Sequence, residues 1–75
     1  MSDEEAAELA RRLRRYEDPF GVGVAERLER GLLCGTAIVG TTQSEAKAVL
    51  TVIEQWAPDR LQDVAASLRI FISSH

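Results

Sequence analysis

The sequence has few of the residues that stabilise very small proteins through covalent or metal bonds. Its 75 residues include one cysteine, Cys34, and one histidine, His75. A lone cysteine cannot form an internal disulfide, and a lone histidine at the last position gives no His/Cys cluster with metal-ligand spacing. We therefore expect no metal and no cofactor. Because a chain of this length buries only about 60% of the surface that its unfolded form exposes, association with a partner is the remaining source of support.

The sequence is also poor in aromatic residues and has no excess of positive charge. Aromatic residues make up 5% of the chain, while hydrophobic residues, mostly aliphatic side chains and alanine, make up 45%. This composition suits packed helices better than a β-sandwich. The formal net charge of -3 argues against a protein whose main task is to neutralise nucleic-acid phosphates. An all-α protein is expected, and nucleic acid is a disfavoured partner.

No hydrophobic run is long enough to cross a membrane. The uncharged segment 31–44 is shorter than the roughly 20 apolar residues that a spanning helix requires, and it contains several hydroxyl residues near its end. The opening residues MSDEEAAELARR are charged from the third position, unlike a signal peptide. We therefore expect a cytoplasmic protein without a membrane span.

Apolar residues recur with helical spacing along most of the chain, which predicts four helices in one domain over residues 1–75. Short connections favour a compact four-helix bundle or an orthogonal helical array. Ser2 or Asp3 is expected to cap the first helix, and TQSE from Thr42 fits the capping-box pattern of the third. Proline at position 19 is expected to end the first helix before a turn, and proline at position 58 to begin the fourth. The predicted helices span residues 3–16, 23–39, 43–56 and 58–72.

The segment GLLCGTAIVG, residues 31–40, is uncharged and punctuated by glycine. It lacks the lysine of a phosphate-binding loop. Residues 36–39 are mostly β-branched, so helix and strand both remain open for them, although the chain offers no clear partner strand. As a buried helix, the segment would place Gly31 and Gly35 on one face, where another backbone can approach closely. That approach could be intramolecular or could cross the two-fold axis of a homodimer.

Several residues are candidates for an interface with a protein partner. Phe20 and Ile70 are apolar where the local pattern predicts exposure. Trp56, beside a proline corner, is either a core anchor or an interface residue, because tryptophan is enriched in both roles. The candidates are Gly31, Gly35, Ile38, Phe20, Ile70 and Trp56.

The densest basic run consists of Arg11, Arg12, Arg14 and Arg15. These arginines are candidates for an electrostatic contact with nucleic acid, anionic lipid or an acidic partner. They could equally form a solvated helix face, in which Glu8 pairs with Arg12 and the positive charges suit the end of the helix.

The sequence offers no constellation typical of catalysis. Cys34 has no histidine nearby to activate it and is expected to be a buried structural residue. The carboxylates alternate with arginines on helix faces and form no paired acid–base site. We expect no enzymatic activity.

The last residues, RIFISSH from Arg69 to His75, resemble the first strand of Toll/interleukin-receptor domains, where apolar alternation leads into a Phe-Ile-Ser segment. The resemblance is confined to this short segment and implies no fold or active site for the rest of the chain. It would matter if the chain were a fragment of a longer protein. The spacing of Leu68, Phe71 and Ile72 favours a continued fourth helix instead.

These patterns favour a small non-enzymatic interaction module, such as an adaptor, an inhibitor or a recruitment domain. It would bury apolar helix surface against another protein or against itself. The alternative is a helix-turn-helix-like DNA-binding regulator that uses the second and third predicted helices. Its recognition helix would expose a single cation, Lys47, where phosphate and guanine contacts normally use several.

Overall fold

The computed structural model describes residues 1–16, 19–32 and 42–74, and the fold is given for these residues. Within these ranges the chain forms four α-helices and no strand. The helices are α1 (Asp3–Arg15), α2 (Pro19–Glu29), α3 (Gln43–Trp56) and α4 (Gln62–Ser73). The predicted all-α fold of packed helices is confirmed, and the last helix continues to Ser73 as its apolar spacing indicates.

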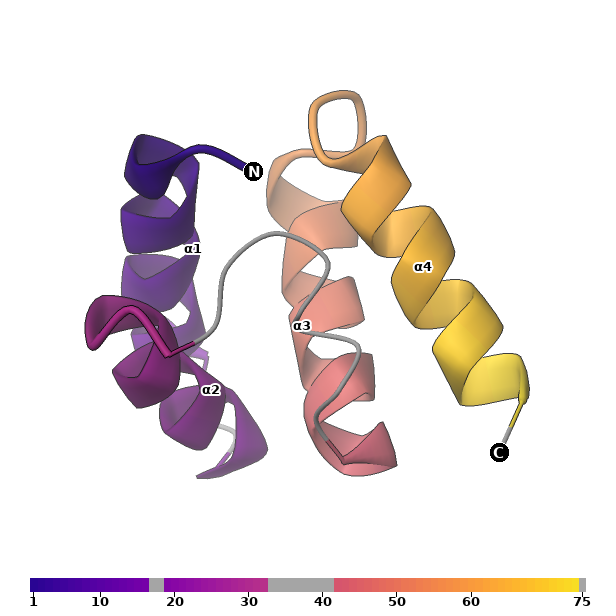
Figure 1. Ribbon diagram of the computed structural model, residues 1–75, viewed down its shortest axis with the longest axis horizontal. Helices are drawn as coiled ribbons and strands as arrows, with labels where there is room; N and C mark the ends of the chain where they lie inside the picture. The colour runs from indigo at the N-terminus through magenta and orange to yellow at the C-terminus, as the bar shows by residue number, and fades with distance from the viewer. Residues whose placement is uncertain (17–18, 33–41, 75) are drawn as a thin grey trace.

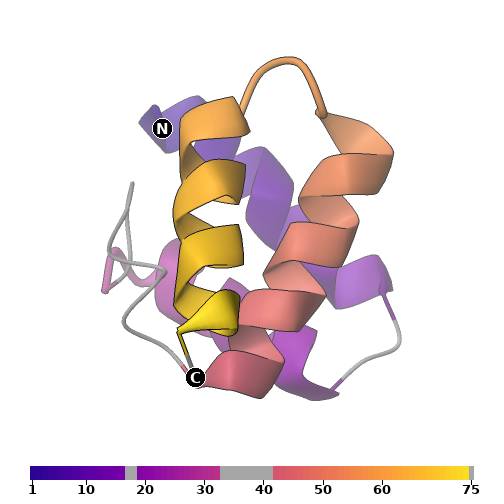
Figure 2. The same ribbon diagram turned by 90° about the vertical axis from the view of Figure 1, so that its right-hand side faces the viewer.

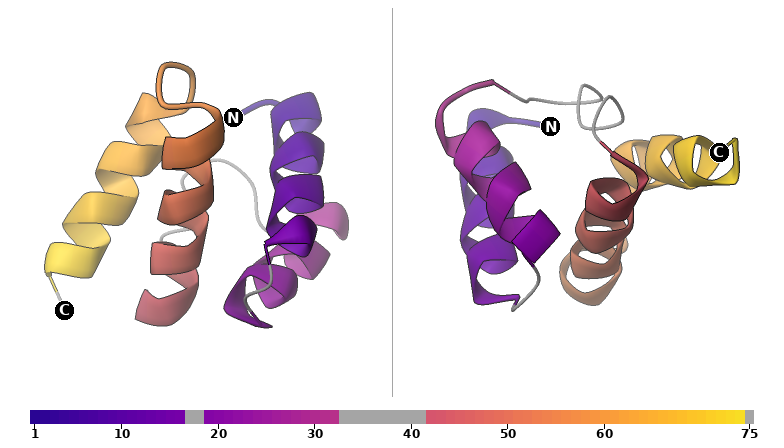
Figure 3. Two further views of the ribbon diagram at one scale, coloured as in Figure 1. Left: turned by 180° about the vertical axis from the view of Figure 1, so that it is seen from behind. Right: turned by 90° about the horizontal axis from the view of Figure 1, so that it is seen from below.

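Helix α3 lies between the α1–α2 pair and α4 (Figures 1 and 3). It contacts all three of the other helices, and α1 also packs along α2. Helices α3 and α4 run in opposite directions (Figure 2), and the turn that joins them lies at the same end of the molecule as the N-terminus of α1. The radius of gyration is 10.7 Å, near the value of about 11 Å expected for a compact chain of this length.

An apolar core joins the four helices. Every helix contributes side chains that are almost completely inaccessible to solvent, at positions that recur with helical spacing. The largest of these are Leu9, Leu13, Val24, Val49, Ile53, Val64 and Leu68. Alanines occupy many of the remaining core positions, so the helices can lie close together.

Two helix starts are capped as the sequence predicts. The Oγ of Ser2 accepts a hydrogen bond from the Glu5 N–H at 3.2 Å, and Glu5 Oε1 accepts one from the Ser2 N–H at 3.0 Å. This reciprocal capping box begins α1. The hydrogen bond from the Ser2 backbone also lowers the pKa of Glu5 below its ordinary value. At α3, the Thr42 Oγ1 accepts the Glu45 N–H at 3.2 Å.

Helix α2 begins earlier than predicted. The expected turn around Phe20 is instead helical, because α2 starts at Pro19. Proline suits the first position of a helix, since its φ is already helical and its missing N–H would have had no partner there. Gly21 is buried in this first turn, where an added Cβ would touch Leu13 of α1 at 3.4 Å. This is where the backbone of α2 comes close to α1.

Helix α2 also ends earlier than predicted, so a continuous helix over residues 23–39 is wrong. The Gly31 N–H donates to the Leu28 carbonyl at 3.1 Å, and the Leu32 N–H donates to the Arg27 carbonyl at 2.8 Å. Together with the positive φ of 72° at Gly31, this is a Schellman motif, which terminates a helix and satisfies its last carbonyls. The remaining predicted helical residues, 33–39, lie outside the described residues, as does the question of helix or strand at 36–39.

Helix α4 begins later than predicted. Pro58 belongs to a turn in which the Ala57 carbonyl accepts the Arg60 N–H at 3.3 Å. The backbone at Leu61 is not helical (φ -113°, ψ 39°), and α4 starts at the following residue. The Leu61 side chain is 2% exposed. Its burial in the core therefore outweighs the local preference of Pro58 for the start of a helix.

Ion pairs link each helix to the next within the described residues. Arg14 donates two hydrogen bonds to Glu29, with distances of 2.6 and 2.9 Å. The interhelical pairs are Arg14–Glu29 (α1–α2), Arg27–Glu45 (α2–α3) and Glu54–Arg69 (α3–α4). The Arg14–Glu29 and Glu54–Arg69 pairs are exposed and contribute little to the free energy of unfolding, so their main effect is to fix how neighbouring helices face each other, whereas Arg27–Glu45 is partly buried.

The same conservative substitution at a buried and an exposed isoleucine compares how much the core and the surface contribute to the free energy of unfolding. We expect Ile53→Val to lower the free energy of unfolding by about 0.5–1.5 kcal/mol, because Ile53 is fully buried. We expect Ile70→Val to change it by less than about 0.5 kcal/mol, because Ile70 is 68% exposed. Urea denaturation measures both values, and equal losses would contradict this description of the core.

The pairing of Glu29 predicts a pH-dependent stability. The hydrogen bond from Arg14 holds the pKa of Glu29 below its ordinary value. Its stabilising contribution is therefore present above the unfolded pKa of about 4.3 and is lost as the pH falls through the lower folded pKa. We expect Glu29→Gln to lower the melting temperature at pH 7 and to have no effect at strongly acidic pH. Thermal denaturation followed by circular dichroism checks this.

Glu26→Gln is the matched control, since Glu26 lies on the same helix, is exposed and has no ion pair in the described structure. It should melt like the unmodified protein at both pH values. A Glu29→Gln effect that persists at acidic pH would show that the loss does not come from the ionised pair.

Candidate functional site

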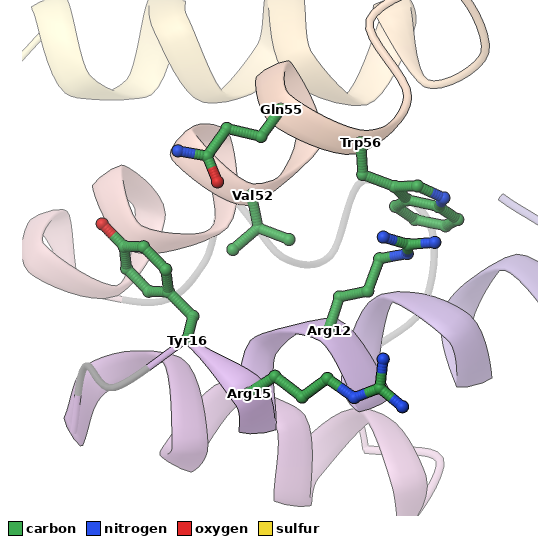
Figure 4. A pocket seen from close by; sticks show the side chains of 6 residues that line it. All are labelled: Arg12, Arg15, Tyr16, Val52, Gln55 and Trp56. Atoms are coloured by element: carbon green, nitrogen blue, oxygen red, sulfur yellow. The ribbon is translucent and has the colours of Figure 1, made fainter.

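A pocket of about 240 Å³ opens between α1 and α3 (Figure 4). Each side supplies residues with the spacing i, i+3, i+4, which places them on one side of their helix. The lining residues are Arg12, Arg15 and Tyr16 from the end of α1, and Val52, Gln55 and Trp56 from α3. The packing of α1 against α3 thus brings together three of the predicted site residues, namely Arg12, Arg15 and Trp56.

Two guanidinium groups hold Trp56 at one end of the pocket. The Cζ of Arg12 lies 4.8 Å from the centroid of the indole ring, and the Cζ of Arg60 lies 5.3 Å from it. These distances are typical of cation–π contacts. Arg12 is fixed in turn by a hydrogen bond of 3.0 Å from its Nε to Glu8 Oε1, which confirms the predicted pair of Glu8 with Arg12. Trp56 is half-buried, so it both packs on the core and faces the pocket.

Arg15 differs from the other arginines of α1. Arg11 and Arg12 both pair with Glu8, and Arg14 pairs with α2. Arg15 is exposed, lines the pocket and has no carboxylate partner among the described residues. Desolvation acts to raise the pKa of Glu8, but its two arginines outweigh this and hold the pKa below its ordinary value. Glu8 therefore stays ionised at neutral pH and keeps Arg11 and Arg12 occupied, while Arg15 is available to a ligand.

The arrangement suits a ligand group with an apolar body and a carboxylate end. In Figure 4, Arg12 and Trp56 lie at one end of the pocket, Tyr16 and Gln55 lie at the other, and Val52 lies between them. The aromatic rings and Val52 offer apolar contact area. The planar guanidinium of Arg15 offers several donors in the geometry that a carboxylate accepts. The pocket is thus a binding site in outline, with one group that lacks its counter-charge.

The remaining interface candidates lie elsewhere. Phe20 is 47% exposed in the first turn of α2, and Ile70 is 68% exposed on α4. Gly31 lies in the turn after α2, and no atom lies within 4 Å of the place where its Cβ would be. Within the described part of one chain, Gly31 therefore has no close backbone neighbour, while an approach by a second copy stays a prediction. Gly35 and Ile38 lie outside the described residues.

Neither a metal site nor a membrane span is found in the described part of the chain. Residues 1–16, 19–32 and 42–74 contain no group of three or more His, Cys, Asp or Glu side chains placed to hold a metal ion. Within the same ranges, every helix is too short or too polar to cross a lipid bilayer. The predicted structural role of Cys34 falls on a residue outside these ranges.

A helix-turn-helix arrangement finds no support in the helix bounds. Helix α2 ends at Glu29 and α3 begins at Gln43, so residues 30–42 connect them. A helix-turn-helix joins its two helices by a turn of about three or four residues. DNA binding stays an alternative prediction that no observation favours.

The sequence reasoning missed half of the pocket. Arg12 and Arg15 are candidates for an electrostatic contact, and Trp56 is an interface candidate, but Tyr16, Val52 and Gln55 are not among the predicted site residues. The signal that was present is the shared i, i+3, i+4 spacing, which sets Arg12 and Arg15 beside Tyr16 at the border of the apolar stripe.

Comparison with known proteins adds no candidate function. The chain matches no protein-family model, no curated protein and no solved structure.

A double-mutant cycle tests whether Arg12 holds Trp56. We expect Arg12→Gln and Trp56→Leu to show a coupling free energy of about 0.5–1 kcal/mol in urea denaturation, because the cation–π contact requires both side chains. The control cycle pairs Arg11→Gln with Trp56→Leu. Arg11 also binds Glu8 but makes no recorded contact with the indole ring, so coupling near zero is expected. Equal coupling in both cycles would contradict a direct contact.

Proposed function

We propose that the protein is a small, non-enzymatic helical interaction module that binds an acidic segment of a protein partner in the α1–α3 pocket. The observation that supports this most directly is Arg15, which lies at the edge of a pocket lined by aromatic side chains and has no carboxylate partner in residues 1–16, 19–32 and 42–74. Adaptor, inhibitor and recruitment roles are all compatible with such a module.

The ion pairs around the pocket explain why Arg15 is the group that would receive the partner. A partner carboxylate that approached Arg12 would have to compete with Glu8, which is already bound at 3.0 Å. At Arg15 it would meet a hydrated guanidinium and could form charge-assisted hydrogen bonds without breaking an existing pair. Arg15 is therefore expected to select for negative charge.

The aromatic residues would supply the contact area. Trp56 and Tyr16 are both half-buried and line the pocket, and tryptophan, tyrosine and arginine are the residue types most enriched among binding hot spots. Because two arginines hold Trp56 in place, little side-chain entropy would be lost at this residue on binding. A partner segment that alternates acidic and aliphatic residues matches both parts of the pocket.

The single tryptophan provides a direct test, because Trp56 is the one tryptophan of the chain and its fluorescence reports on the pocket. The probe is a short peptide of alternating leucine and glutamate, compared with the same peptide carrying glutamine in place of glutamate. We expect a saturable change in Trp56 emission with the acidic peptide and about two- to fivefold weaker binding of the glutamine peptide, since one exposed charge contact is lost.

Arg15→Glu is expected to abolish this preference for the acidic peptide. Arg30→Glu makes the same change of charge at an exposed residue beyond the end of α2 and outside the pocket lining, and it should retain the preference. Equal binding of both peptides, or an Arg15→Glu variant that binds like the unmodified protein, would refute the proposed site.

A further inference from the structure

Four exposed carboxylates that have no ion-pair partner in the described structure lie at one end of the molecule. Asp3 and Glu4 lie in the first turn of α1, Asp59 lies in the turn after α3, and Asp63 lies in the first turn of α4. The start of α1 and the α3–α4 turn are at the same end (Figures 1 and 2). We call these residues the acidic end. In contrast, arginines pair with Glu8, Glu29, Glu45 and Glu54.

Helix dipoles explain the position of these acids but do not neutralise them. The N-terminus of a helix carries roughly half a positive charge, so the starts of α1 and α4 together offset about one of the carboxylates. Arg60 is exposed at the same end and offsets another, although it lies over the ring of Trp56. The ammonium group of Met1, which acts on Glu5 in the first turn of α1, offsets a third, so the acidic end keeps a small net negative charge.

The acidic end cannot fill the pocket of its own molecule through α1. Asp3 and Arg15 are the first and last residues of this helix, which sets them roughly 18 Å apart at a rise of 1.5 Å per residue. One molecule thus presents an unpaired cation at the pocket and unpaired carboxylates at the far end of the same helix. Asp3 and Glu4 can therefore meet Arg15 only on a different molecule.

We infer that the acidic end of one copy docks into the α1–α3 pocket of a second copy, in a head-to-tail contact. This inference rests on the proposed function and names the acidic partner as the chain itself. The two copies use different surfaces, so each contact leaves one pocket and one acidic end unoccupied. Such heterologous contacts add further copies and form an open chain, unlike a two-fold dimer, which closes after two copies.

Charge complementarity selects this occupant. The turn between α3 and α4 projects from the end of the bundle (Figure 1), with Asp59 in the turn and Asp63 in the first turn of α4, so their exposed carboxylates can approach another molecule. The pocket of that molecule offers Arg15 for a carboxylate and aromatic rings for the aliphatic side chains beside it. Contact between charges of opposite sign also sets the orientation, because two acidic ends or two arginine-rich pockets would repel each other.

The test measures molar mass by light scattering over chain concentrations from about 10 μM to about 1 mM, a range that covers weak association. For the unmodified protein at low salt we expect the mean mass to rise past twice the 8.3 kDa of one chain without a plateau. In about 1 M salt, where the screening length is about 3 Å, we expect monomers.

Two variants each remove one half of the contact. Arg15→Glu disables the pocket, with Arg15→Gln as a milder replacement, and Asp59→Asn/Asp63→Asn disables the acidic end. We expect each variant to be monomeric alone. Their equimolar mixture should form dimers of twice the chain mass and nothing larger, because one variant still has an acidic end and the other still has a pocket.

Arg30→Glu and Glu26→Gln change charges elsewhere on exposed residues and should associate like the unmodified protein. Circular dichroism confirms that every variant is folded.

Three results would overturn the inference. The first is a monomeric unmodified protein over the whole range at low salt, and the second is a plateau at twice the chain mass, which indicates a two-fold dimer. The third is a mixture that stays monomeric although the unmodified protein associates. If acidic peptides still change the fluorescence of Trp56 while the chain fails to associate, the partner is a different protein and the proposed function stands without this inference.

Discussion

The structure depends on the burial of one helix, α3, between the α1–α2 pair and α4. Val49 and Ile53 of this helix are fully buried, and α3 contacts each of the other helices. Burying one such side chain contributes about 1.5–3 kcal/mol, which is a large share of the roughly 5–15 kcal/mol that stabilises a small domain. The same burial sets the position of the pocket, because Val52 precedes Ile53 and Trp56 follows it by one helical turn.

Much of the fold could be predicted from local sequence, and the errors share a physical cause. Apolar spacing and the caps at Ser2 and Thr42 are local signals, and they predict the starts of α1 and α3 correctly. Gly31 follows Arg27 and Arg30 directly after the apolar positions of α2, which is the pattern of a helix end, yet it was interpreted as a packing glycine. At Pro19 and Pro58 the local rule allows a helix to start, but only the packing of neighbouring residues decides whether it does.

The candidate site was only partly predictable for a different reason. Arg12, Arg15 and Trp56 were each singled out from the sequence, and the periodicity of each helix shows which residues share a side. Periodicity does not show that the edge of α1 lies beside the edge of α3, since that depends on how apolar faces from distant parts of the chain pack together. Periodicity also does not distinguish Arg15 from Arg14. Arg14 is occupied by an ion pair only because the fold brings Glu29 of α2 within hydrogen-bond distance of it.

The ion pairs distinguish arginines with a structural role from the arginine that is proposed to bind a partner. Arginines that meet a glutamate on their own or a neighbouring helix are used within the fold, and they hold helices and Trp56 in place. Within the described residues, Arg15 and the carboxylates of the acidic end are among the charges that this pairing leaves over. Exposed charge pairs contribute little affinity, so in the proposed contact the charges would select and orient the partner, while Trp56 and Tyr16 would supply most of the binding free energy. A contact built in this way would be reversible and sensitive to salt, because its selectivity depends on charges that water and ions reach in the separated molecules.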